Sequence, residues 1–271
     1  MYKKFYNLTE DPFNITADPD FFFSSSRHSE AFSHLSYGIK QRKGIIVVTG
    51  EIGTGKTTLC RTLLRRLDEK TKSALILNPS FSDLQLLRLI VKDLGIETTA
   101  KNKYDLVNAL NSFLFQEANR GHNVILIIDE AQNLGIKQLE QIRLLSNLET
   151  EKEKLLQIIL VGQPELLDKL RLDALRQLNQ RVTVRYHILP LDREELESYI
   201  NHRLKVASAE NEKNKIHFTK EAVDVIYENS KGTPRMINIL CDRALLAGFI
   251  AETYKIDEHI IHKCLQEVVY Q

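Results

Sequence analysis

The stretch from Gly44 to Leu64, GIIVVTGEIGTGKTTLCRTLL, constrains the fold more than any other part of the chain. It opens with the β-branched run Ile45 to Thr49, which is typical of a strand buried on both faces of a parallel sheet. Apolar residues at helical spacing follow from Leu59 to Leu67. The stretch therefore predicts a buried strand, a glycine-rich loop and a helix in succession.

The loop, GEIGTGKT at residues 50–57, fits the P-loop pattern G-x-x-x-x-G-K-[ST] in full. Its glycines let consecutive backbone N–H groups curl around phosphate oxygens, and the helix start adds a partial positive charge aimed at the same anion. Lys56 is expected to reach the β- and γ-phosphates, and the Thr57 hydroxyl to bind Mg²⁺. The flanking strand and helix make a chance glycine-rich turn the weaker interpretation. The predicted nucleotide-binding residues are Gly50, Glu51, Ile52, Gly53, Thr54, Gly55, Lys56, Thr57 and Thr58.

A second chemical group follows the aliphatic run Val124 to Ile128, which ends in Asp129 and Glu130. Such a run predicts a buried strand whose carboxylates lie at the edge where parallel sheets bind ligands. Asp129 is suited to hold Mg²⁺ or its water, and Glu130 to orient and deprotonate an attacking water. An acidic pair in this position can also be a helix N-cap or a solvated turn, but the P-loop favours the functional interpretation. The interval between Lys56 and Asp129 leaves room for one additional strand, as in the additional-strand ATPases.

Three more strands are predicted, at 74–77, 155–161 and 182–188. Five strands that alternate with helices indicate an α/β fold with a parallel sheet. Gln163 follows the strand at 155–161, and a polar residue there would lie between the two acids and the γ-phosphate. We therefore predict that Gln163 senses the nucleotide.

After residue 190 the pattern predicts helices only, which indicates a second domain. We expect a P-loop nucleotide-binding domain over residues 1–190, in which 1–43 form an N-terminal wrapping segment, and an all-helical lid domain over 191–271. In the wrapping segment, Phe13 or the Arg27-His28 pair is a candidate for contact with adenine. The expected helix starts of the lid are marked by Asp192 with Glu195, Thr219, Pro234 and Asp257.

Composition narrows the cellular context. The 271 residues carry 37 Lys and Arg against 36 Asp and Glu, so no overall basicity argues for nucleic acid. No apolar run approaches the roughly 18 to 20 residues that cross a bilayer, and the N-terminal residues lack the apolar core of a signal peptide. Cys60, Cys241 and Cys264 are widely separated on apolar helical stripes, which favours buried thiols over a disulfide or metal set. These features predict a cytoplasmic protein.

Six segments of the chain point together to one family. They are YKKFYNLTEDPF at 2–13, GEIGTGKTT at 50–58, DEAQNL at 129–134, GQPEL at 162–166, LNQR at 178–181 and GTPRMINILCDRAL at 232–245. In combination they resemble the AAA+ ATPases of the general secretion pathway protein A type. The resemblance covers essentially the whole chain and implies a five-stranded P-loop domain with a helical lid, ATP and Mg²⁺ held between them, and homo-oligomers in the form of a ring or a filament.

The resemblance also implies roles for single residues. Gln163 would be a first sensor, Arg235 a second sensor reaching over from the lid, and Arg181 or Arg176 the finger that completes a neighbour's site. The alternative for each of these two arginines is an exposed side chain that serves solubility. The choice between Arg176 and Arg181 as the finger stays open. Arg235 stands at a helix start, where the macrodipole disfavours a cation, and an anionic partner such as phosphate would explain it.

The predicted function is Mg²⁺-dependent ATP hydrolysis that drives or regulates a protein assembly at the bacterial cell envelope, in a secretion, pilus or exopolysaccharide export system. Members of this type often continue into a membrane-spanning helix and a peptidoglycan-binding part, whereas this chain ends at Gln271. We therefore expect no transmembrane segment in this chain, and attachment to the inner membrane through an envelope protein partner.

Two alternatives remain open from the sequence. One is a DNA-associated ATPase that regulates transposition, and the other is a nucleotide-gated scaffold with negligible hydrolysis. The first needs a basic track that binds phosphates, although the available residues more often form the solvated face of the P-loop helix. These residues are Arg61, Arg65, Arg66, Lys70 and Lys72.

Overall fold

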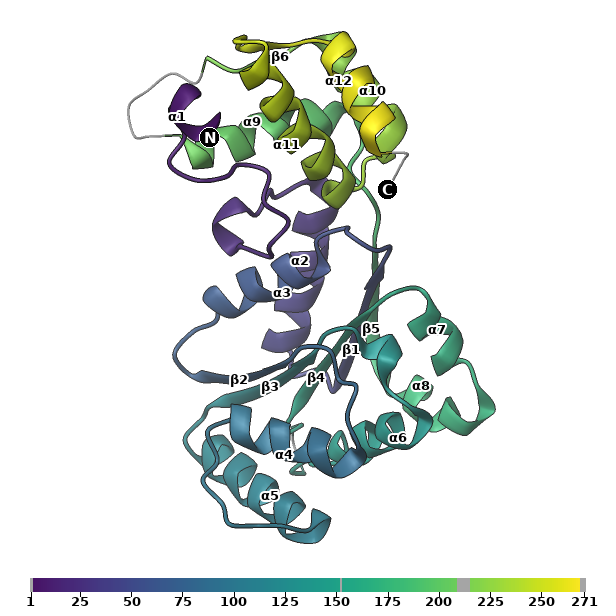
Figure 1. The fold of residues 1–271 in the computed structure, drawn as a ribbon. Helices are drawn as coiled ribbons and strands as arrows, with labels where there is room; N and C mark the ends of the chain where they lie inside the picture. The colour runs from purple at the N-terminus through teal and green to yellow at the C-terminus, as the bar shows by residue number, and fades with distance from the viewer. Residues whose placement is uncertain (1, 152, 209–214, 269–271) are drawn as a thin grey trace. The chain divides into compact units, whose positions relative to one another are not determined.

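The computed structural model describes residues 2–151, 153–208 and 215–268 (Figure 1). The chain forms two compact units. Unit 1 consists of Met1–His28, Gly53–Thr58 and Leu189–Gln271, and unit 2 of Ser29–Ile52 and Leu59–Ile188. The sequence predicted a single boundary near residue 190. In the structure, the N-terminal segment as far as His28 and the second half of the P-loop, from Gly53, group with the C-terminal helices instead.

The centre of unit 2 is a five-stranded sheet with the order β2-β3-β4-β1-β5, in which every neighbouring pair is parallel. This confirms the predicted α/β fold. Every residue of β1 and β4 is buried, and so is all of β3 except its first residue, because unbroken aliphatic runs belong to strands covered on both faces. The strands are β1 Ile45–Gly50, β2 Thr71–Ile76, β3 Asn123–Ile128, β4 Gln157–Gly162 and β5 Val182–Ile188.

Helices cover both faces of this sheet. Figure 1 shows α4, α5 and α6 on one side, and on the other side those parts of α2 and α3 that belong to the same unit. A capping box formed by Ser82 and Gln85 begins α4. The helices are α2 Ser26–Lys40, α3 Lys56–Arg65, α4 Asp83–Asp93, α5 Lys103–Asn119, α6 Ile136–Leu145, α7 Glu165–Leu170 and α8 Arg176–Gln180, with short 3₁₀ helices at Ala131–Asn133 and Asp173–Leu175.

Unit 1 is mostly helical, but the prediction of an all-helical lid is wrong in one detail. Two short strands, β6 His217–Phe218 and β7 Lys255–Ile256, pair in parallel. Each buries one apolar side chain, Phe218 and Ile256, and strands this short are unable to give a periodic signal. The helices of unit 1 are α1 Tyr2–Phe5, the 3₁₀ helix Pro19–Phe21, α9 Arg193–Ala207, α10 Lys220–Ser230, α11 Pro234–Ile250 and α12 Glu258–Val268.

The N-terminal segment is part of the core of unit 1. Phe13 and Phe21 are buried in the same apolar cluster as residues of α9 and α11, and the Phe13 ring lies edge-on to Phe218. Arg203 on α9 is buried beneath this segment and donates to the carbonyl oxygens of Pro12 at 2.5 Å and Asn14 at 2.9 Å. The segment therefore contributes core side chains, and Phe13 takes a packing position.

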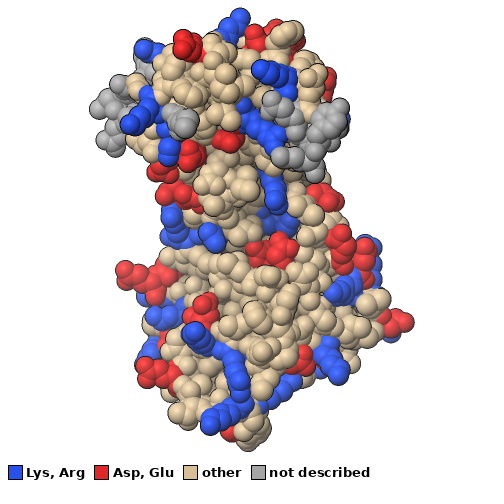
Figure 2. All heavy atoms as spheres, viewed as in Figure 1, with Lys and Arg blue, Asp and Glu red and all other residues tan. Residues whose placement is uncertain are grey.

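Two further expectations concern the whole chain. The three cysteines are buried and form no disulfide, as predicted. Within the part of the chain that the structure describes, no helix has the length and apolar character needed to cross a bilayer. Figure 2 shows Lys and Arg interspersed with Asp and Glu on the face in view, which agrees with the balanced net charge.

Candidate nucleotide-binding site

The P-loop connects the end of β1 at Gly50 to the start of α3 at Lys56, as the sequence predicts. Gly53 and Gly55 have φ angles of +81° and +90°, in the left-handed region that favours glycine. A Cβ atom at Gly53 would lie 2.6 Å from the Cβ of Arg235, so the loop has no room for a side chain there. The loop therefore requires its glycines both for backbone conformation and for close packing.

Two donors from unit 1 bind the carbonyl groups of this loop. The backbone N–H of Arg235, at the start of α11, donates to the Gly53 oxygen over 3.2 Å. Nε2 of His28 lies 2.8 Å from the Thr54 oxygen. The resemblance implies that Arg235 reaches the nucleotide. In the structure its backbone N–H contacts the P-loop and its side chain is exposed. The contact between His28 and the loop was not predicted.

Asp129 and Glu130 follow β3 at the carboxyl edge of the sheet. Asp129 is buried, and its Oδ1 accepts from the Glu130 N–H at 2.9 Å. Glu130 has a φ of 54°, an uncommon conformation for a non-glycine residue that recurs at functional sites. Its Oε2 accepts hydrogen bonds from Nε2 of Gln132 at 2.5 Å and Nε2 of Gln163 at 3.3 Å. The structure thus brings Gln163 beside one of the predicted acids.

Gln132 was missed by sequence reasoning, although it lies in the DEAQNL segment. Its Oε1 accepts from the backbone N–H of Gln163 at 3.1 Å, so it bridges the tips of β3 and β4. A Cβ at Gly162 would lie 2.7 Å from that oxygen, which explains a glycine at the end of β4. Lys169 on α7 donates to the carbonyl oxygens of Gln132 at 2.5 Å and Leu134 at 2.9 Å and so holds the segment in place.

The two candidate finger arginines lie at the ends of α8. Arg176 is exposed at its start, and Arg181 is partly exposed after its end. Arg181 directly precedes β5, whose first residue pairs with Ile45 at the beginning of β1. Arg181 is therefore at the amino edge of the sheet, roughly 20 Å along β5 from the carboxyl edge that carries Glu130.

Other residues and hollows of unit 2 are separate from this site. Four of the five residues of the proposed basic track are exposed, and Arg61 is partly exposed. The guanidinium of Arg66 lies 4.9 Å from the centre of the Phe32 ring. No group of three or more His, Cys, Asp or Glu side chains that could hold a metal occurs among the described residues.

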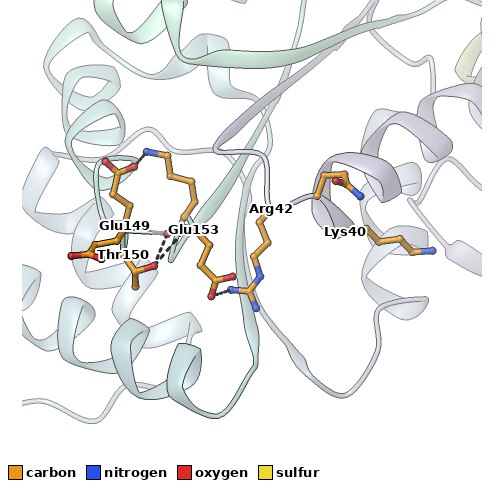
Figure 3. A pocket seen from close by; sticks show the side chains of 8 residues that line it. Lys40, Arg42, Glu149, Thr150 and Glu153 are labelled. Atoms are coloured by element: carbon orange, nitrogen blue, oxygen red, sulfur yellow. Dashed lines mark hydrogen bonds and ion pairs between the residues drawn. The ribbon is translucent and has the colours of Figure 1, made fainter.

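A hollow of about 730 Å³ lies in unit 2, between the residues that precede β1 and those that precede β4. Figure 3 shows the side chains that line it. Four of its charged side chains form two ion pairs: Arg42 donates to Glu153 at 2.8 Å, and Lys154 donates to Glu149. It lies at the amino edge of the sheet, whereas ligands of parallel sheets bind at the carboxyl edge. The P-loop, and not this hollow, therefore stays the candidate nucleotide site.

The chain is similar in sequence to known proteins. A family model described as an AAA domain matches residues 39–170. The chain is 42% identical over 260 residues to the general secretion pathway protein A of Aeromonas hydrophila, in an alignment that covers 94% of this chain and 46% of that protein. The chain thus spans about half the length of the curated relative it matches.

Solved structures show the fold. Cdc6p from Pyrobaculum aerophilum superposes with a TM-score of 0.68 at 16% identity, over 92% of this chain and 70% of that one. ORC2 from Aeropyrum pernix, solved as ADPNP-ADP complexes, superposes with a TM-score of 0.64 at 17% identity, over 88% and 66%. By sequence, the chain belongs to the AAA+ P-loop proteins of the general secretion pathway protein A type.

Proposed function

We propose that this protein binds ATP with Mg²⁺ and hydrolyses it, and that hydrolysis drives or regulates a protein assembly at the bacterial cell envelope. The observation that supports hydrolysis is the position of Glu130 at the carboxyl edge of the sheet. Only β4 separates its strand, β3, from β1, whose carboxyl end leads into the P-loop. This is the edge at which parallel α/β sheets carry out their chemistry.

Each residue has a distinct role in this proposal. The loop N–H groups and the ammonium of Lys56 bind the phosphates. The oxygen donors that fit Mg²⁺ are the Thr57 hydroxyl and the Asp129 carboxylate, since this ion takes one or two protein oxygens beside phosphate oxygens and waters. When bound, Mg²⁺ would neutralise charge on the transferred phosphoryl group.

Glu130 accepts a proton from the water that attacks the γ-phosphorus. The bond from that phosphorus to the bridging oxygen breaks, and ADP and inorganic phosphate are released. Gln163 holds the Glu130 carboxylate from the neighbouring strand tip, where its amide donates at 3.3 Å. The sensor role proposed for Gln163 is supported by this contact.

Two arginines are proposed to supply the remaining positive charges at the nucleotide. Arg235 is proposed to contact the nucleotide from its place beside Gly53. Arg181 or Arg176 is proposed to complete the site of a second copy in a ring or filament. The position of Arg181 at the amino edge of its own sheet supports a role at a neighbour's site, because it lies far from the Glu130 of the same chain.

The envelope role rests on the similarity to general secretion pathway protein A over 94% of this chain. We propose a cytoplasmic protein that reaches the inner membrane through an envelope partner. The Cdc6p and ORC2 structures are only 16% and 17% identical to this chain and support the fold alone, so they do not favour the DNA-associated alternative.

The test is phosphate release from ATP and GTP by the wild type, Lys56→Ala and Glu130→Gln, with and without EDTA. We expect Mg²⁺-dependent release by the wild type and loss of nucleotide affinity in Lys56→Ala. Glu130→Gln is expected to bind ATP normally and to turn it over at least roughly a hundredfold more slowly, because it lacks the proton acceptor.

Three outcomes would change the proposal. Unchanged hydrolysis in Glu130→Gln would remove the base assignment. Nucleotide binding without turnover in the wild type would support the scaffold. Turnover stimulated by duplex DNA at low salt would support the DNA-associated alternative.

A further inference from the structure

We infer that His28 is a positioning residue for the phosphate-binding loop: its ring fixes the orientation of the Thr54–Gly55 peptide and so aims the Gly55 N–H at the bound phosphates. The inference rests on the proposed function and deepens it. All the residues involved belong to unit 1, which contains both His28 and the loop residues Gly53–Thr58.

The hydrogen bonds determine the tautomer of His28. Nε2 lies 2.8 Å from the Thr54 carbonyl oxygen, and because a carbonyl only accepts, Nε2 carries the proton. Nδ1 lies 2.7 Å from the Ser25 hydroxyl and accepts its proton. The Ser25 oxygen also accepts from the His28 backbone N–H at 3.2 Å. Both ring nitrogens are therefore engaged, and the ring has one orientation.

The surroundings of His28 keep the ring neutral and in place. The side chain is 4% exposed, and the ring of Phe22 meets it edge-on. Burial lowers the pKa of His28, while the Thr54 carbonyl and the Glu195 carboxylate act in the opposite direction. A buried ring with both nitrogens hydrogen-bonded is suited to hold a neighbouring group and not to exchange protons with a substrate.

Peptide geometry transmits this contact to the ligand side of the loop. The C=O and N–H of one trans peptide point in opposite directions. The bond from His28 to the Thr54 oxygen therefore turns the Gly55 N–H away from His28. In the same way, the bond from the Arg235 N–H to the Gly53 oxygen turns the Thr54 N–H away from α11. Two consecutive N–H groups are thus oriented from behind, as a phosphate cradle requires.

The fit at Gly55 supports a specific contact. A Cβ at this position would lie 3.1 Å from Nε2 of His28, and Gly55 has a φ of +90°. Without the donor at His28, the Thr54 carbonyl would lose this hydrogen bond and the peptide could rotate. One lost hydrogen bond of this kind predicts roughly tenfold weaker binding of a phosphate-bearing ligand.

The experiment compares His28→Phe, His28→Gln and His34→Phe with the wild type. His28→Phe keeps a ring and removes the donor, whereas His28→Gln places an amide N–H near the position of Nε2. His34 is the matched control, since it lies on the same helix and is exposed. The measurements are the Kd for ADP by calorimetry and the ³¹P shift of the β-phosphate of ADP at saturation.

We expect His28→Phe to bind ADP roughly tenfold more weakly and to move the bound β-phosphate resonance toward that of free ADP. His28→Gln is expected to recover most of both properties, and His34→Phe to match the wild type. Thermal melts without nucleotide check folding. If both His28 variants unfold, Ser25→Ala is measured instead, with a smaller loss of ADP affinity expected and an unchanged affinity overturning the inference.

The experiment distinguishes a failure of the proposed function from a failure of the inference about His28. A wild type that does not bind ADP would overturn the proposed function and this inference together. Normal binding by the wild type, with an unchanged Kd and an unchanged ³¹P shift in His28→Phe, would overturn the inference alone.

Discussion

At the scale of single residues, hydrogen bonds hold both the backbone and the carboxylate of Glu130 in place. Its backbone is left-handed, a conformation that costs of order 1–3 kcal/mol and is kept only where surrounding contacts enforce it. Here the Glu130 N–H donates to Asp129, and its carbonyl accepts from the Asn133 N–H at 2.9 Å. Of the two amides that donate to the carboxylate, Gln132 makes the shorter contact.

This arrangement predicts that Gln132 supports turnover and not nucleotide affinity. Gln132→Ala removes one donor to Glu130 and the acceptor for the Gln163 N–H. We expect kcat to fall roughly tenfold, since a hydrogen bond to a charged group is worth about 1.5–3 kcal/mol and about 1.36 kcal/mol is tenfold in rate. Single-turnover phosphate release and ADP affinity, measured on the same preparations, separate the two effects.

Asn133→Ala is the control for this prediction. Asn133 is the neighbouring amide in the same 3₁₀ helix, is exposed, and its side chain donates to Asn78 at 3.5 Å and not to Glu130. It should keep wild-type turnover. A rise in turnover in Gln132→Ala would contradict the prediction and would mean that the two amides hold Glu130 away from the attacking water.

At the scale of elements, the sequence predicts the helices and strands that are long, show a clear apolar period or begin with a capping residue. The run 182–188 is β5 to the residue, and the box from Asp192 to Glu195 starts α9. The motif residues of the site were also predicted, because each stands in a short contiguous pattern. By contrast, α1, β6 and β7 have too few residues to show a period. His28 and Gln132 could not be assigned, because their roles depend on contacts made only in the folded chain.

Arg203 illustrates why the N-terminal segment was placed with the wrong unit. A cation on an amphipathic helix is expected at the surface, but Arg203 is buried and contacts two backbone carbonyls and the face of Phe21 at 4.8 Å. No local pattern in residues 1–28 indicates that α9 supplies these hydrogen-bond donors. The segment is fixed to unit 1 by polar contacts as well as by its aromatic side chains.

From these contacts we predict that Arg203→Met loosens the N-terminal segment. The methionine fills much of the volume but leaves the carbonyls of Pro12 and Asn14 without their buried donor, at a cost of roughly 2–4 kcal/mol. Denaturant unfolding should show this loss, and hydrogen exchange should rise selectively in residues 9–23. Lys205→Met, an exposed change on the same helix, should leave both measurements unaltered.

At the scale of the whole molecule, the separation between Arg181 and Glu130 in unit 2 has a consequence for activity. An arginine at the amino edge of the sheet cannot contact a phosphate bound near the carboxyl edge of the same sheet. If Arg181 is the finger, each site needs a second copy of the chain. Specific activity should then rise with protein concentration, in parallel with assembly followed by light scattering in the presence of ATP.

The decisive form of this prediction mixes two inactive variants. Arg181→Ala should bind ATP normally and lose at least roughly a hundredfold in turnover, because a finger stabilises charge only in the transition state. Glu130→Gln should also be inactive but retains its arginine. In a mixture, the Arg181→Ala subunit keeps its Glu130, and a neighbouring Glu130→Gln subunit supplies Arg181 to the same site. Activity should therefore return.

Arg176→Ala, mixed with Glu130→Gln in the same way, tests the other candidate finger. Arg171→Ala is the control for loss of an exposed arginine, since its guanidinium pairs with Asp168 on the neighbouring turn. Recovery with only one of the two finger variants identifies the finger. Activity that is independent of concentration, together with a fully active Arg181→Ala and Arg176→Ala, would instead mean that every catalytic charge comes from one chain. In that case Arg235, whose backbone already contacts the P-loop, would be the cation left to test.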